Sequence, residues 1–467
     1  MKKIKRRFEQ FMFYDYAGIE HHLNDMAKKG WKLHKISPFY WEYHKIEPQN
    51  LIYSVTYFSE ASEFNPYPTE NQHIFYDYCT MAGWNLVTEW AQMQIFCSNE
   101  KEAMPIETEE AVKLKAIHKA MKKNFIPSNI VLLLLAIAQL VLHFQTIKLD
   151  PISKLSDGST LCVVAIFILL FLQVLFTLTF YFNWYYRSKK AIEAGASCIE
   201  NKDGYRHFIS LLSVLVLIAA SFSMLSLSTK LFGWVSIWVV ANFAVLIPLI
   251  NLIKKTLKRA GVTRRINLII TIFSCFFFTF TLIFVMSLGI IKGLNAGWFG
   301  NKPDATYTTT IHGYSHDWDI YHHKLPLYVE DLEHISYDHY SYRWTKNNTI
   351  LLSYSKGEQR SFPDGVEAPE LDYEIVRVKI PLLYNICLKD YLEKYDYDYP
   401  MPEEERRYFK KINESKWQAD VVYQLYLQDR EQGVYILCKD DLIVYINFHT
   451  VPTMDQIIIA AEKLLTK

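Results

Sequence analysis

The chain has 467 residues, of which 51% are hydrophobic, and its formal net charge is +1. A charge so close to zero gives no reason to expect direct binding to nucleic acid. The seven cysteines show no CxxC or zinc-finger spacing, which argues against a cysteine-based metal site. The apolar residues are concentrated in the middle third of the chain, so the first expectation is a multidomain membrane protein.

Two helices are predicted in residues 1–104, and each ends at a glycine. Asp15 is a candidate N-cap for the first helix, which ends at Gly30. The second helix begins after Pro68 and ends at Gly83. Each helix has three apolar residues on one face at helical spacing: Ile19, Leu23 and Met26 in the first, and Ile74, Tyr78 and Met81 in the second.

Strands are expected on either side of both helices, which gives the order βαβββαββ. They are predicted at 7–14, 31–33, 39–46, 51–58, 84–86 and 93–97. This order favours a cytoplasmic α+β domain with a ferredoxin-like sandwich. A Gly-Trp pair follows each helix, and Trp31 and Trp84 are most simply interpreted as core aromatics. The alternative is that they contact a ligand or a partner protein.

Several short motifs in this region resemble one bacterial family. They include Gly18-Ile19-Glu20, Met26-Ala27-Lys28-Lys29-Gly30-Trp31, Lys45-Ile46-Glu47-Pro48, Ala82-Gly83-Trp84 and Pro105-Ile106-Glu107-Thr108. Residues 1–125 thereby resemble the domain-of-unknown-function family 2812, which is common in Firmicutes. The resemblance implies a membrane-tethered cytoplasmic domain, often encoded beside a PadR-type transcription regulator, so such a regulator is an expected partner. The family has no established catalytic residues to transfer.

Residues 105–125 are predicted to form an amphipathic, basic connector helix. Leu114, Ile117 and Met121 fall on one side, and five lysines between positions 113 and 123 occupy much of the rest. One interpretation places the helix along the inner membrane surface, attracted by anionic lipid. The other is an ordinary solvated connector between the domain and the bilayer.

Five apolar segments lie within residues 126–291, and each is long enough to cross a bilayer core of about 30 Å as a helix. They are 126–147, 160–183, 208–228, 231–251 and 266–291. None contains Asp, Glu, Lys or Arg. We therefore predict a five-helix transmembrane bundle in contact with lipid. The lack of ionisable groups argues against a proton pump or an ion-coupled transporter.

The residues flanking these segments indicate their orientation. Sixteen Lys and Arg lie in residues 113–123 just before the first segment, between the second and third, and between the fourth and fifth. The opposite flanks contain five. The positive-inside rule therefore predicts a multi-pass cell-membrane protein with a cytoplasmic N-terminus and an extracytoplasmic C-terminus.

Residues 300–467 are predicted to form an external α+β domain. Strands are expected at 305–311, 349–354, 373–380, 421–427, 433–439 and 442–448, with a closing helix at 454–465. The stretch 389–417 is expected to be loop and short helix. Cys387 and Cys438 lie where disulfides persist, so they are expected either to form a disulfide or to be two separate buried thiols.

Histidines are frequent at the start of this domain, and His312, His316, His322 and His323 are candidate metal ligands. Imidazole is a natural ligand for zinc and copper. The HxxxH spacing of His312 and His316 lacks the Glu of HExxH, and Gly313 disfavours the helix that this motif needs. An exposed polar surface is therefore the simpler interpretation. The segment 313–317 begins like GxSxG but ends in Asp317, so it is not a hydrolase signal.

Two folded domains on opposite sides of a charge-free bundle favour a transmembrane sensor or regulatory protein that relays an external signal to a cytoplasmic partner. The alternatives are a membrane export component without an ATPase, and an external metal-binding module. There is no Walker loop, GxGxxG motif or recognisable pair of catalytic carboxylates, so no enzymatic activity, catalytic residue or cofactor is predicted. Nothing in the pattern indicates an oligomeric state.

Overall fold

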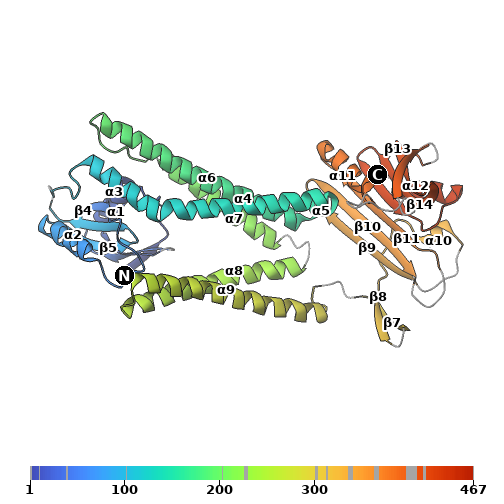
Figure 1. Cartoon of the computed structure of the whole chain (residues 1–467), viewed down its shortest axis with the longest axis horizontal. Helices are drawn as coiled ribbons and strands as arrows, with labels where there is room; N and C mark the ends of the chain where they lie inside the picture. The colour runs from blue at the N-terminus through green and yellow to red at the C-terminus, as the bar shows by residue number, and fades with distance from the viewer. Residues whose placement is uncertain are drawn as a thin grey trace. The chain divides into compact units, whose positions relative to one another are not determined.

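The computed structural model divides the chain into two compact units, many of whose elements are labelled in Figure 1. The first unit comprises Met1–Leu140, Ala165–Ser221 and Val235–Gly289, and the second comprises Val141–Val164, Phe222–Trp234 and Ile290–Lys467. The residues described are 3–9, 11–37, 40–100, 103–201, 203–225, 230–299, 303–311, 314–334, 340–361, 368–395, 407–413 and 417–465.

The N-terminal domain of the first unit has the predicted order βαβββαββ. Its elements are β1 (Ile4–Arg7), α1 (Tyr16–Lys28), β2 (Trp31–Ile36), β3 (Trp41–Lys45), β4 (Ile52–Tyr57), α2 (Glu70–Met81), β5 (Asn85–Trp90) and β6 (Met93–Ser98). The strands form two antiparallel sheets, in the orders β1-β3-β2 and β4-β6-β5. Each sheet with its helix forms a split β-α-β motif. The two motifs meet inside the N-terminal domain, where β2 contacts β5. A single ferredoxin-like sheet is therefore not confirmed.

The helix ends follow the predicted local chemistry. The carboxylate of Asp15 accepts a hydrogen bond from the backbone N–H of Gly18 at 3.3 Å and caps α1. Gly30 and Gly83 have φ angles of 81° and 83°, the left-handed conformation in which glycine ends a helix at no steric cost. The predicted first strand was wrong in extent, because β1 ends at Arg7.

The predicted apolar face of α2 exists, but it faces solvent rather than the core. Ile74, Tyr78 and Met81 are 61%, 58% and 81% exposed. The buried side of α2 instead presents Gln72 and Cys79. In α1 the predicted face is buried as expected, with Ile19, Leu23 and Met26 all in the core.

The connector is part of the N-terminal domain. Helix α3 (Glu110–Lys123) buries Leu114, Ile117, Ala120 and Met121 in the same core cluster as α1 and strands of both sheets. Its apolar side is therefore occupied by protein, which corrects both the expectation of a helix lying on lipid and that of a solvated connector. Its lysines lie mostly on the outer side.

Long apolar helices follow α3. They are α4 (Phe125–Leu149), α6 (Gly158–Glu193), α7 (Asp203–Leu225), α8 (Lys230–Arg259) and α9 (Arg264–Asn295), with the short α5 (Pro151–Ser156) after α4. Among the residues described, four helical stretches are long and apolar enough to cross a membrane: Glu110–Leu149, Gly158–Glu193, Gly233–Arg259 and Arg264–Asn295. Between their charged ends, the exposed side chains of these stretches are mostly hydrophobic, as lipid contact requires.

The predicted span at 208–228 differs from the other four. Helix α7 covers most of it, but the described apolar helix there is the shorter His207–Ile218. Residues 226–228 of the predicted span lie outside the described part of the chain. A five-helix bundle is therefore not confirmed by length and composition.

The C-terminal part of the second unit is built on a seven-stranded antiparallel sheet in the order β12-β13-β14-β15-β11-β10-β9. Its strands are β9 (Tyr340–Asn348), β10 (Leu352–Ser361), β11 (Leu371–Val378), β12 (Arg407–Ile412), β13 (Val421–Leu427), β14 (Arg430–Lys439) and β15 (Leu442–Asn447). A separate hairpin is formed by β7 (Ala305–Ile311) and β8 (Tyr314–Ile320).

Helices cover both faces of this sheet. Helices α10 (Val329–Leu332) and α12 (Met454–Leu464) pack on one face, where Tyr435, Leu437 and Val444 point. Helix α11 (Tyr384–Leu392), which follows the 3₁₀ turn Pro381–Leu383, packs with α5 on the other face, against Ile436 and Ile443. The alternation along β14 and β15 thus fills two cores, one on each side of the sheet.

Candidate functional site

The region with the most specific contacts is where the N-terminal domain meets the long helices of the first unit. Tyr14, in the turn before α1, is 1% exposed. Its ring centroid lies 5.0 Å from that of Tyr181, 5.1 Å from that of Trp184 and 5.9 Å from that of Phe125. Tyr181 and Trp184 belong to α6, and Phe125 begins α4. Because such aromatic pairs each stabilise by about 0.5–1.5 kcal/mol beyond area burial, this cluster holds both helices to the domain.

The segment 198–201, which follows α6, is tied to three elements at once. Four hydrogen bonds hold it: Cys198 N–H to Glu110 Oε2 (2.7 Å), Trp184 Nε1–H to Ile199 O (2.7 Å), Ile199 N–H to Ser188 Oγ (3.2 Å) and Asn201 Nδ2–H to Asp15 Oδ1 (3.3 Å). These partners lie on α3, on α6 and at the cap of α1. A displacement of the α6 end therefore acts on the N-terminal domain directly, through polar as well as apolar contacts.

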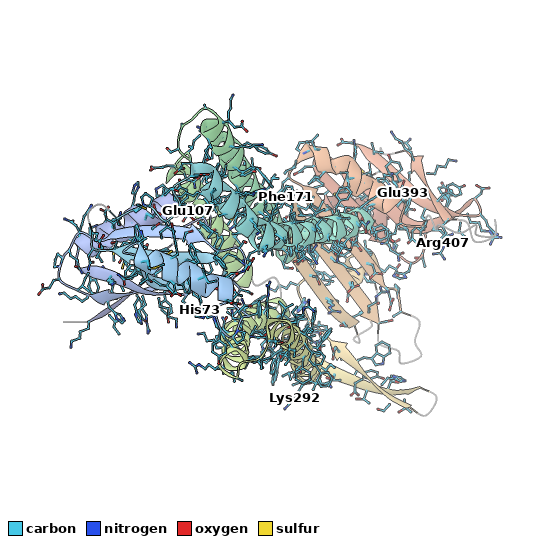
Figure 2. The ribbon with its side chains drawn as sticks, turned by 60° about the vertical axis from the view of Figure 1, so that its left-hand side comes forward. His73, Glu107, Phe171, Lys292, Glu393 and Arg407 are labelled. Carbon is cyan, nitrogen blue, oxygen red and sulfur yellow. The ribbon has the colours of Figure 1, made fainter. Side chains whose placement is uncertain are left out.

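The contacts of Tyr14 and of segment 198–201 with the N-terminal domain, α4 and α6 are called the junction below. Two buried carboxylates lie beside it. Glu20 of α1 accepts a hydrogen bond from the N–H of Val55 at 2.7 Å, and Glu107 accepts one from the hydroxyl of Thr56. Figure 2 labels Glu107, in the segment before α3. Burial raises the pKa of Glu20 to about 7 and also raises the pKa of Glu107, while the positive charge of Lys113 opposes both shifts. The junction thus contains one carboxyl group, that of Glu20, which exchanges its proton near neutral pH, and a second, that of Glu107, whose pKa burial also raises.

A second attachment joins the loop before α2 to α8 and α9. Asn267 of α9 is fully buried, and its amide nitrogen donates to the carbonyl of Phe64 at 3.1 Å. Lys254 of α8 forms an ion pair with Glu63. Partly exposed ion pairs contribute little, whereas a buried amide that loses its partner costs about 1–3 kcal/mol. Asn267 is therefore the principal polar anchor of this attachment.

The two tryptophans singled out in the sequence lie in different environments. Trp84 is 3% exposed, and its indole N–H donates to the carbonyl of Met104 at 2.8 Å, so it is a core residue with its donor satisfied. Trp31 is half-buried on β2, with Lys5 Nζ 5.2 Å from its ring centroid. Contact of either residue with a partner stays a prediction, and Trp31 is the one with accessible surface.

The candidate metal ligands of the C-terminal domain do not converge in the residues described. His316 is exposed on β8 and His322 is exposed beyond it. The Nδ1 atom of His323 accepts a hydrogen bond from the backbone N–H of Trp344 at 3.1 Å. His312 lies outside the described residues. Within the described ranges, the side chains spaced closely enough to hold an ion are instead His34, Glu42 and His44 of the N-terminal domain.

The two cysteines of the C-terminal domain are free and buried. Cys387 lies on α11 and Cys438 on β14, and both belong to the core between α11 and the sheet. Their pairing in an oxidising compartment stays a prediction. Burial raises the pKa of Cys387 to about 11 and also raises that of Cys438, so both thiols are protonated at neutral pH.

Sequence reasoning missed the residues of the junction. Tyr181 and Trp184 stand at the end of a predicted span, where Trp and Tyr are ordinarily interpreted as an interfacial aromatic belt. Tyr14 was placed in a strand. The one sequence signal for this contact is the high number of aromatic residues both near Tyr14 and near Tyr181, and it does not indicate which of them pack together.

A comparison with known families identifies part of this arrangement. The family described as protein of unknown function (DUF2812) matches residues 15–128. The match runs from the cap of α1 through α3 into the start of α4, so it includes the helix that the structure assigns to the N-terminal domain. No curated protein and no solved structure matches the chain.

Proposed function

We propose that this protein is a transmembrane regulator, in which a stimulus acting on the C-terminal domain changes how the N-terminal domain presents itself to a cytoplasmic partner. The observation that supports this proposal is the packing of α4 and α6. Phe125 of α4 and Tyr181 of α6 pack in the core of the N-terminal domain. Ile147 of α4 and Leu161 of α6 pack against the core beneath the seven-stranded sheet.

These helices are suited to transmit a displacement. Helix α6 has 36 residues, which at 1.5 Å per residue makes it about 54 Å long. A helix fixed in a close-packed core at each end cannot shift at one end without repacking at the other. Packed interfaces respond by switching between discrete arrangements, which is how small shifts become a signal.

The relay is tested by disturbing one end and observing the other. Leu155 of α5 is buried against the sheet, and its carbonyl accepts a hydrogen bond from the hydroxyl of Thr349 at 2.8 Å. Leu155→Ala removes that packing at a typical cost of about 2–5 kcal/mol. In full-length protein in lipid nanodiscs, we expect faster hydrogen exchange at the amides of Cys198 and Ile199. Unchanged exchange there would refute the relay. Ile350→Ala, at a neighbouring position that is 83% exposed, is the matched control.

The proposed topology has five crossings, including 208–228, with the N-terminus in the cytoplasm. It rests on the basic residues in the flanks. Met81→Cys and Ile350→Cys, each in a cysteine-free background, place one thiol at an exposed position of each domain. A membrane-impermeant maleimide should label the Ile350→Cys protein in intact cells and the Met81→Cys protein only after lysis. Labelling of both or of neither in intact cells would mean an even number of crossings.

The proposed contact surface for the partner is the exposed apolar face of α2. Gly30 and Gly83 end the two helices and are 53 positions apart, so Ile74, Tyr78 and Met81 correspond to positions 21, 25 and 28 of α1. Those positions hold the polar residues His21, Asp25 and Lys28. An apolar face at a position where the equivalent helix is polar is suited to protein contact.

The expected partner is a PadR-type transcription regulator, on the basis of the family resemblance. A photo-crosslinking amino acid at Met81, in native membranes, should trap it. The same amino acid at Lys28, the equivalent position of α1, is the control. Recovery of no such regulator from position 81, or equal recovery from both positions, would count against this partner.

A groove in the C-terminal domain offers a binding place for the stimulus. It has a volume of about 440 Å³ and is lined by β9, β10, β11 and α12. Its described lining includes Lys346, Arg377, Lys379 and Lys463 beside Trp344, without an acidic side chain. Because Arg377 and Lys463 already pair with Asp441 and Asp331, a small anionic ligand with a flat apolar part would be held mainly by Lys346 and Lys379 beside Trp344. Loss of such binding in Lys346→Glu would support the assignment, and unchanged binding would refute it.

A further inference from the structure

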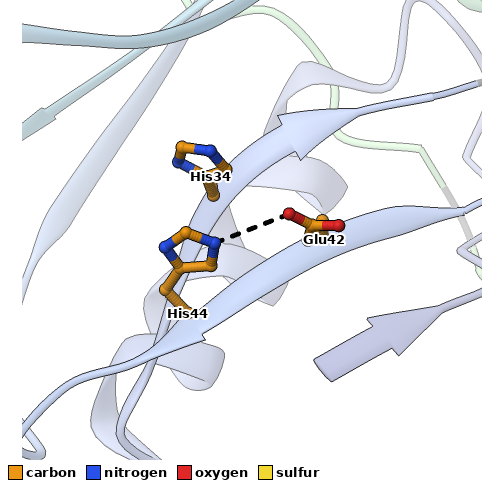
Figure 3. Close-up of side chains that lie close together, drawn as sticks. All are labelled: His34, Glu42 and His44. Atoms are coloured by element: carbon orange, nitrogen blue, oxygen red, sulfur yellow. Dashed lines mark ion pairs between the residues drawn. The ribbon is translucent and has the colours of Figure 1, made fainter. Parts of the chain in front are cut away.

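Three side chains with metal-binding chemistry converge on the solvent-facing side of the first sheet of the N-terminal domain (Figure 3). His34 comes from β2, and Glu42 and His44 come from β3. Their ligand atoms all lie within 4.8 Å of one another. His44 Nε2 lies 3.5 Å from Glu42 Oε1, and the imidazole rings of His34 and His44 are stacked with centroids 4.0 Å apart.

A β-bulge in β2 creates this convergence. The register between β2 and β3 shifts between Leu33 and Lys35, so His34 is the extra residue. As a result Leu33 and Ile36, three positions apart, are both buried, and His34 and Lys35 between them are both exposed. Bulges re-aim side chains at sheet edges and beside functional sites. Here the bulge directs His34 toward the two side chains of β3.

We propose that His34, Glu42 and His44 bind one divalent transition-metal ion of the zinc class. Two imidazoles and one carboxylate are a donor set that zinc uses when a fourth position is left for water or an incoming ligand. The mixture of nitrogen and oxygen donors without a thiolate disfavours copper(I), and the two imidazoles disfavour magnesium and calcium. This binding does not depend on the relay proposed above.

The geometry requires only a small contraction. Bonds of about 2.0–2.2 Å place neighbouring ligand atoms of a tetrahedral site about 3.3–3.6 Å apart. Side-chain rotations on the exposed face are sufficient to close the present spacing to that value, because no core residue has to move. The strands supply a rigid base, since Glu42 and His44 are alternate residues on one face of β3.

Arg6 of β1 completes the surroundings. Its Nε donates to Glu42 Oε2 at 2.9 Å, which leaves Oε1 directed toward His44. A hydrogen bond to the far oxygen of a ligating carboxylate is the usual means by which a second residue orients it. The neighbouring Lys5 is directed over the ring of Trp31, with its Nζ 5.2 Å from the centroid.

The test uses full-length protein in detergent, freed of metal by chelation and titrated with Zn²⁺ against a chromophoric chelator. The single variants are His34→Ala, Glu42→Gln and His44→Ala, and His73→Ala on α2 is the control at an exposed histidine outside the group. Mutating a residue that only hydrogen-bonds to a metal ligand typically lowers metal affinity about 10–100-fold. Removing a ligand itself should cost more, so we expect each of these variants to bind Zn²⁺ at least about 100-fold more weakly. The control should bind as the wild type does.

Two results separate this site from the C-terminal histidines and from misfolding. Bound Co²⁺ should give visible absorption of four-coordinate type in the wild type and in His73→Ala, but not in His44→Ala. The metal-free variants should unfold at the same temperature as the wild type, because the substituted side chains lie on the solvent side. Unaltered Zn²⁺ affinity in all three ligand variants, or no binding at micromolar Zn²⁺, would overturn the proposal.

Discussion

Glu20 offers the sharpest test of how the junction responds to pH. The substitution is Glu20→Gln, which keeps an amide oxygen to accept the N–H of Val55 and removes the ionisable group. In the folded protein burial raises the pKa of Glu20 from its ordinary 4.5 to about 7. The folded state therefore holds this proton over a pH range in which the unfolded chain has released it.

The sign follows from proton binding. Between pH 4.5 and about 7 the folded state binds more protons than the unfolded state, so stability falls as pH rises. At about 1.36 kcal/mol for each pH unit, the difference corresponds to about 3 kcal/mol of stability lost by pH 8. Glu20→Gln avoids that loss. The variant should match the wild type near pH 4.5 and exceed it by about 3 kcal/mol at pH 8.

The assay is amide hydrogen exchange of β4 and β6 in the full-length protein, corrected for intrinsic rates, at pH 5 and pH 8. Protection of these strands should fall at pH 8 in the wild type and fall by less in the variant, which retains only the raised pKa of Glu107. Glu47→Gln, at an exposed position, should behave as the wild type does. Wild-type protection that is equal at both pH values, or equal protection of wild type and Glu20→Gln at pH 8, would refute the reasoning.

Two further substitutions and one labelling experiment test the other packing contacts. Trp184→Phe keeps an aromatic ring but removes the indole N–H that donates to Ile199. Amide hydrogen exchange should show that the amides of segment 198–201 lose about 1–3 kcal/mol of protection. Gly433→Ala would place a methyl group 1.9 Å from a backbone carbonyl oxygen, so thermal unfolding of the C-terminal domain should show a loss of about 1–3 kcal/mol. Cys387 and Cys438 should resist maleimide at pH 7 until the protein is denatured, and labelling of the native protein would contradict their burial.

Much of the local structure could be predicted because its signals are local. Asp15 caps α1 and Gly83 ends α2 through chemistry that involves only a few neighbouring residues. The strands β13 to β15 lie close to the ranges predicted for them, because the alternation of apolar residues is also a local signal. Asp440, between β14 and β15, has the positive φ of 52° that is expected in a tight turn. The four spanning stretches follow from length and composition alone.

The remaining features depend on which surface meets which, and periodicity does not encode that. The apolar residues of α2 share a face, as predicted, but the other face of the helix packs on its sheet. In α3 the apolar side is covered by the N-terminal domain rather than by lipid. Both errors have one cause. An apolar face on a helix predicts that the face is buried, but it does not identify the protein or lipid surface that buries it.

The same limit applies to the candidate metal ligands. The histidines from 312 to 339 are close in sequence, yet those described lie on separate elements or are already hydrogen-bonded. His34 and His44 are ten positions apart and meet only because β2 and β3 pair with a bulge between Leu33 and Lys35. A bulge has no strong local signature in these strands, which contain neither Gly nor Pro.

The repeated β-α-β-β unit has a mechanical consequence for the two attachments. At the spacing of 53 residues, Tyr14 before α1 corresponds to Tyr67 before α2, so the two halves are held by equivalent segments, one to α6 and the other to α8 and α9. If α6 moves together with α8 and α9, the N-terminal domain moves with them and its internal contacts stay unchanged. Only unequal movement strains the boundary between β2 and β5. Under the proposed relay, the N-terminal domain would respond to unequal movement of α6 and of α8 with α9, and would not respond to movement that these helices share.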